Sequence, residues 1–80
     1  MTKRRLAAGG WMVKAVTPDL RGGDPIEQWF TVGEPEKVDA ELAVKEHPDA
    51  GEAAVIARRE LSDDEIASLA LGPGEVRSYH

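Results

Sequence analysis

The sequence predicts an α+β domain: a three-stranded antiparallel sheet with two helices lying mainly on one face. Three observations predict it. Two stretches alternate apolar residues with others at period two, one stretch repeats at helical spacing before a proline, and a capping signal opens a second helix near the C-terminus. A chain of 80 residues has room for a single hydrophobic core, so we expect one domain.

The first two strands are predicted over residues 11–17 and 26–32, where β-branched and aromatic side chains alternate with others. Between them, residues 18–25 hold two prolines, two glycines and two aspartates, which supply the fixed or positive φ angles and side-chain caps of a turn. The chain therefore reverses there, and a β-hairpin is the simplest outcome.

A helix is predicted to follow the hairpin. Pro35 suits a first helical turn, and the glutamates on either side of it place negative charge at the helix N-terminus. Val38 and Leu42 recur at helical spacing with charged residues opposite them, which indicates an amphipathic helix. Pro48 ends it.

A third strand over residues 53–61 and a second helix complete the predicted elements. Residues 53–61 are rich in small and β-branched side chains. Ser62, followed three residues later by Glu65, forms a capping-box pattern ahead of an apolar run. Gly72 and Pro73 stop this helix, because glycine accepts a left-handed cap and proline cannot continue.

A right-handed crossover from the second strand to the third gives the strand order 2-1-3 with antiparallel neighbours. We expect residues 1–9 to be a flexible basic leader, residues 10–80 to be the domain, and residues 75–80 to be extended or loose. The core is predicted to contain nine apolar side chains: Trp11, Val13, Phe30, Val32, Val38, Leu42, Ile56, Ile66 and Leu69.

Composition removes several functional classes. The chain has no cysteine, so neither a disulfide framework nor a thiolate metal site is available, and the cytoplasm is the default location. No apolar run approaches the roughly 20 residues of a membrane span. The net charge of -5 disfavours nucleic acid, which only the cations Lys3, Arg4 and Arg5 would hold. No motif indicates a cofactor, a metal or a catalytic residue.

Trp29 is the most informative residue for function. Alternation places it opposite the apolar side of its strand, and two readings stay open. Either it lies exposed on an open sheet face with Lys14 and Arg58, a mixture typical of binding hot spots, or the second helix or Tyr79 covers it.

The sequence thus indicates a small, non-enzymatic protein interaction module that binds a copy of itself or another protein through the open sheet face or an edge strand. The alternative is a small-ligand-binding protein, or a minor enzyme, with a polar pocket formed by the turn at residues 19–24 and the helix ends.

Overall fold

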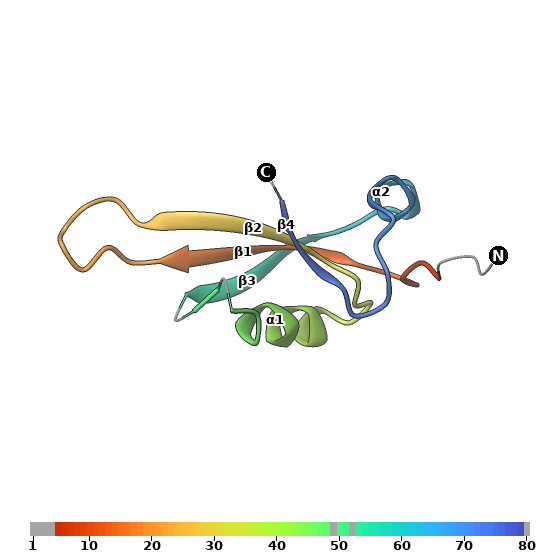
Figure 1. The fold of residues 1–80 in the computed structure, drawn as a ribbon, viewed down its shortest axis with the longest axis horizontal. Helices are drawn as coiled ribbons and strands as arrows, with labels where there is room; N and C mark the ends of the chain where they lie inside the picture. Colours follow the sequence, from red (N-terminus) through yellow and green to blue (C-terminus); the bar gives the residue numbers. More distant parts are fainter. Residues whose placement is uncertain (1–4, 49, 52, 80) are drawn as a thin grey trace.

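The computed structural model describes residues 5–48, 50–51 and 53–79, and these form a four-stranded antiparallel sheet with two helices (Figure 1). The elements along the chain are β1 (Trp11–Thr17), β2 (Ile26–Val32), α1 (Lys37–Lys45), β3 (Ala54–Glu60), α2 (Asp63–Leu69) and β4 (Val76–Tyr79). The strand order across the sheet is β3-β1-β2-β4.

The predicted hairpin is present. β1 and β2 pair over their full length, from Trp11 opposite Val32 to Thr17 opposite Ile26. The turn between them points away from both helices, and it gives the molecule an elongated shape with extents of 51 × 22 × 19 Å (Figure 1). In this turn the Asp19 side chain accepts a hydrogen bond from the backbone amide of Arg21 at 2.9 Å, as expected of an aspartate turn.

The order 2-1-3 holds for the three predicted strands, with β1 between β2 and β3, but the sheet has a fourth strand. β4 comes from the tail that the sequence left as extended or loose, and it pairs with β2. The ladder begins where the amide of Gly33 donates to the carbonyl of Glu75 and the amide of Gly74 donates to the carbonyl of Gly33, both at 2.8 Å. The four residues of this strand, VRSY, do not alternate apolar with polar side chains, so periodicity does not reveal it.

The prediction that both helices lie mainly on one face is wrong. α1 covers one face, where Val44 packs among the buried side chains of Val13 and Phe30. α2 lies against the opposite face at one end of the sheet, where Ile66 packs with Met12 (Figure 1). The sheet therefore has apolar residues on both faces of β1, and neither helix covers the part of the second face nearest the hairpin turn.

Three residues of the predicted core are exposed instead. Val38 and Leu42 lie on the outer side of α1, at 64% and 50% exposure, because the helix turns Ala40 and Val44 toward the sheet. These two pairs lie on opposite sides of a helix with 3.6 residues per turn. Ile56 is 45% exposed on the face away from α1. Of the other six, four are buried and two partly buried: Val13, Phe30, Val32 and Ile66, then Trp11 and Leu69.

The capping box of α2 is present, with Ser62 accepting from the amide of Glu65 and the Glu65 carboxylate accepting from the amide of Ser62. The helix ends earlier than predicted. Ala70, not glycine, takes the left-handed cap at φ 50°, two residues before Gly72. At the other helix, Pro35 precedes the N-cap, and its carbonyl accepts the indole hydrogen bond of Trp11 at 3.1 Å.

The predicted leader is described only from residue 5 onward, and residues 1–4 lie outside the described part of the chain. Arg5 is exposed. Ala7 is buried in the cluster beneath α2, and its amide donates to the carbonyl of Leu71 at 2.9 Å. The packed chain thus includes part of the segment before residue 10.

Gly33 gives a test of the junction that starts β4. A side-chain methyl group at this position would overlap the carbonyl oxygen of Gly72 and press on Ala7. We expect Gly33→Ala to lower the free energy of unfolding by about 3 kcal/mol, measured by urea denaturation. Gly51→Ala is the control, since its φ of +54° costs strain of about 1 kcal/mol but its surroundings are open. Equal stability of Gly33→Ala and the native chain would contradict this close approach.

Candidate functional site

A row of four side chains crosses the uncovered face of the sheet. Ile56 of β3 lies opposite Lys14 of β1, Lys14 lies opposite Trp29 of β2, and Trp29 lies opposite Tyr79 of β4. Side chains at paired positions project to the same face, so these four residues form one line, the cross-sheet row. With strands about 4.8 Å apart, the row is about 14 Å long.

The cross-sheet row is partly exposed along its length. Ile56 and Tyr79 at its two ends are 45% and 50% exposed, and Lys14 and Trp29 between them are half-buried. The ammonium of Lys14 lies 5.8 Å from the centroid of the Trp29 ring and 2.8 Å from a carboxylate oxygen of Glu27. This geometry is that of a cation–π contact, which holds the indole against the sheet.

Trp29 therefore combines the two readings that the sequence left open. It lies on the face away from α1 with Lys14, and it also packs against the apolar cluster under α2 and has Tyr79 as its strand partner. The structure places Arg58 apart from these two. Met12 pairs with Arg59 and Val13 with Ala57, so Arg58 falls in the bulge between the two registers and is exposed.

The sequence did not indicate two members of the row, Ile56 and Tyr79, as site residues. Ile56 was assigned to the core, because nothing in the run of small residues around it shows which face of the strand is covered. Tyr79 belongs to the row because it pairs with Trp29, and it does so from β4, the strand that the sequence did not predict. Its aromatic side chain near the chain end was the available signal.

Two arginines hold α2 over the end of the sheet. On β3, Arg59 makes a two-pronged salt bridge to Glu65, with both nitrogen–oxygen distances at 2.8 Å. On β4, Arg77 donates to the carbonyl of Leu69 in the last helical turn and to the carboxylate of Glu75 at 2.6 Å. Because β3 and β4 are the two edges of the sheet, the guanidinium groups fix the two ends of α2 from opposite sides.

The salt bridge also fixes the charge of Glu65. The hydrogen bonds from Arg59, with a further one from the backbone amide of Ser62, lower the pKa of the Glu65 carboxyl to about 2. The same contact raises the pKa of Arg59. Glu65 is therefore ionised throughout the neutral and mildly acidic range.

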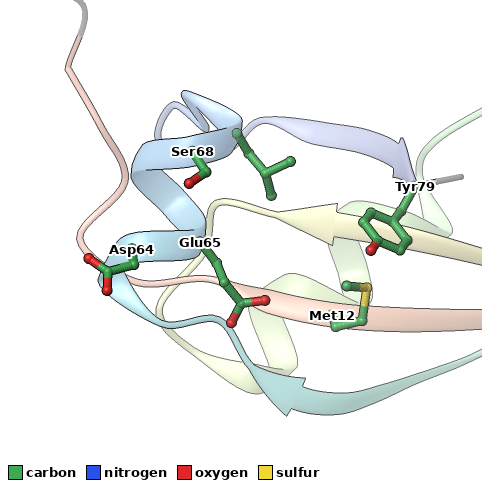
Figure 2. Close-up of a pocket in the computed structure, with 6 residues that line it drawn as sticks. Met12, Asp64, Glu65, Ser68 and Tyr79 are labelled. Atoms are coloured by element: carbon green, nitrogen blue, oxygen red, sulfur yellow. The ribbon is translucent and has the colours of Figure 1, made fainter.

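A cleft of about 270 Å³ opens between α2 and the cross-sheet row (Figure 2). Figure 2 shows Met12 and Tyr79 on the sheet side, and Glu65 reaching from α2 toward the sheet. The lining is more apolar than polar, and it consists of Met12, Asp64, Glu65, Ser68, Leu69 and Tyr79. The sequence predicted a polar pocket formed by the turn at residues 19–24 and the helix ends. The cleft includes residues of α2 but none of that turn, and α2 lies at the other end of the sheet from the turn (Figure 1).

The described residues include a histidine, aspartates and glutamates, which are common metal ligands. Among them, no group of three or more histidine, cysteine, aspartate or glutamate residues is arranged to hold a metal ion. The ring of His47 lies 5.6 Å from that of Phe30, against the core. No helix in the described part of the chain is both long and apolar enough to cross a membrane.

Comparison of the chain with protein-family models, with curated proteins and with solved structures found no match.

The Arg59 salt bridge makes acid stability testable. The folded-state pKa of Glu65 lies below its ordinary value of 4.5, so the ionised pair stabilises the fold above that value, and this contribution is lost as the pH falls from about 4.5 toward 2. We expect Arg59→Gln to raise the Glu65 carboxyl midpoint measured by NMR and to weaken the acid dependence of stability over this window.

Arg58→Gln is the matched control, because Arg58 is exposed in the bulge, whereas the hydrogen bonds to Glu65 come from Arg59. A Glu65 midpoint that moves equally in both variants, or in neither, would contradict the role of the salt bridge.

Proposed function

We propose that this protein is a non-enzymatic interaction module, and that the open face of its sheet binds a partner protein. The observation that carries the proposal is the cross-sheet row, in which Trp29 and Tyr79 adjoin a lysine and an exposed isoleucine across all four strands. Tryptophan and tyrosine are among the residues that contribute most to binding at protein interfaces. The Lys14 contact orders the indole before binding, which lowers the entropy cost of association.

Charge favours another chain over a second copy. Two molecules that each carry a net charge of -5 repel one another, and a net charge well away from zero keeps small proteins monomeric. A partner with a basic surface is instead attracted to this negatively charged chain. We therefore commit to a partner that is another protein, with a positively charged contact surface.

The open face is a better site than the β3 edge. The amide of Ala57 on that edge donates to the Glu41 carboxylate of α1 at 2.9 Å, so part of the edge is already occupied. A strand added there would have to displace this hydrogen bond. The open face requires no such rearrangement.

The cleft favours a second candidate function, the binding of a small molecule. Its volume of about 270 Å³ lies just below the roughly 300–1,000 Å³ of sites that enclose drug-sized ligands, and it is open on one side. A small ligand would leave the far end of the row, at Ile56, untouched.

Site-specific photo-crosslinking tests the proposed function. A photoreactive amino acid in place of Ile56 is expected to give a discrete adduct with another protein in cells of the source organism. The same amino acid in place of Leu42, which has similar exposure on the outer side of α1, is expected not to give it. The purified partner should then bind Trp29→Ala more than about tenfold more weakly than the native chain.

Leu42→Ala serves as the binding control, and circular dichroism establishes that each variant is folded. Equal affinity of a folded Trp29→Ala variant, or the same adducts from both positions, would contradict the proposal. If a small molecule binds in the cleft with the same affinity in the native chain, in Trp29→Ala and in Leu42→Ala, the second candidate function, small-molecule binding, would be favoured.

A further inference from the structure

We propose that the cleft beside the cross-sheet row receives an arginine side chain from the partner protein. This inference rests on the proposed function, and it adds the chemistry that the partner must present. It follows from the volume of the cleft, from the residues that line it and from the charge of α2.

The volume of the cleft, about 270 Å³, has room for one long side chain. This volume is smaller than that of sites that enclose a whole drug-sized ligand. The cleft opens directly beside Tyr79, the last residue of the cross-sheet row. A partner that lies along the row would thus bring one of its side chains to the mouth of the cleft.

The lining suits an apolar stem. Met12 is 6% exposed, so it is a nearly buried apolar surface, and Leu69 of α2 packs with it. Tyr79 is half exposed and presents an aromatic ring. Long cationic side chains bury their methylene groups on such surfaces, and a guanidinium group stacks on aromatic rings more readily than an ammonium group does.

The charge at the helix is negative. The first turn of α2 holds three consecutive acidic residues, and two of them, Asp64 and Glu65, line the cleft. Arg59 forms its ion pair with Glu65 and also donates to the backbone carbonyl of Glu60. Lys14 does not offset the other carboxylates, because it is already paired with Glu27. Of the two carboxylates that line the cleft, Glu65 is balanced by Arg59, whereas Asp64 forms no ion pair among the described residues. Arg77, at the other end of α2, is balanced by Glu75. The rim therefore keeps a net negative charge, which attracts a cation and repels an anion.

The ionisation of Glu65 keeps this rim negative at neutral pH, since its pKa lies near 2. The carboxylate accepts two hydrogen bonds from Arg59 and one from the amide of Ser62. An ionised carboxyl group has about four acceptor positions, so one is left for an incoming donor.

The test uses the full chain and two small probes, N-acetyl-arginine amide and its neutral analogue N-acetyl-citrulline amide, titrated while backbone amide signals are followed by NMR. We expect the arginine probe to shift the signals of residues 64–69 and Tyr79 in a saturable way, and the citrulline probe to bind at least about threefold more weakly. Tyr79→Leu and Asp64→Asn should each weaken arginine binding by about two- to fivefold.

Asp39→Asn is the matched control, an exposed acid on α1 on the other face of the sheet. Equal binding of the two probes, shifts spread over α1, or an equal effect of the control variant would overturn the proposal. A concentration-dependent rise in mass that Tyr79→Leu abolishes would also overturn it, because a second copy would then fill the cleft. If partner binding still depends on Trp29 in any of these cases, the arginine inference fails while the proposed function stands.

Discussion

The placement of α2 by two arginines is the interaction on which the candidate site depends. A helix of seven residues is too short to be stable alone, and Ile66 is its one fully buried residue. Arg59 from one sheet edge and Arg77 from the other bind the first and last turns of the helix. The guanidinium group of Arg77 also lies at the negative end of the helix dipole. α2 therefore stays at one end of the sheet and leaves the rest of that face uncovered.

The two faces of the sheet differ because the two helices differ. α1 presents alanine and valine, so it lies close to its face and seals a continuous core. α2 contacts the opposite face through the buried Ile66, the partly buried Leu69 and hydrogen bonds from two arginines. Beside it lie the cleft and the cross-sheet row. An aromatic row next to a cleft with a negative rim is a surface that distinguishes partners by both shape and charge.

The strands of the hairpin, the central place of β1 and the capping box of α2 were predictable, because each depends on local alternation or on a short capping signal. The side of α1 that faces the sheet was not, since small residues such as Ala40 pack more closely than Val38 would. The fourth strand arises from a close backbone approach at Gly33, which no periodicity records. Alternation along the hairpin strands was enough to place Trp29 and Lys14 on one face as candidate binding residues, whereas the position of Tyr79 and the cleft depend on the fourth strand and on α2.

The open sheet face is tested most directly by the solvent accessibility of two isoleucine side chains, Ile56 on that face and Ile66 of α2, which packs against it. Their δ1-methyl signals are compared by NMR while a soluble, neutral gadolinium chelate is added to the isolated protein. We expect strong broadening of the Ile56 signal, at 45% exposure, and little broadening of the Ile66 signal beneath α2, at 2% exposure. Equal protection of both methyl groups would contradict this expectation, because the face proposed to bind a partner would already be covered.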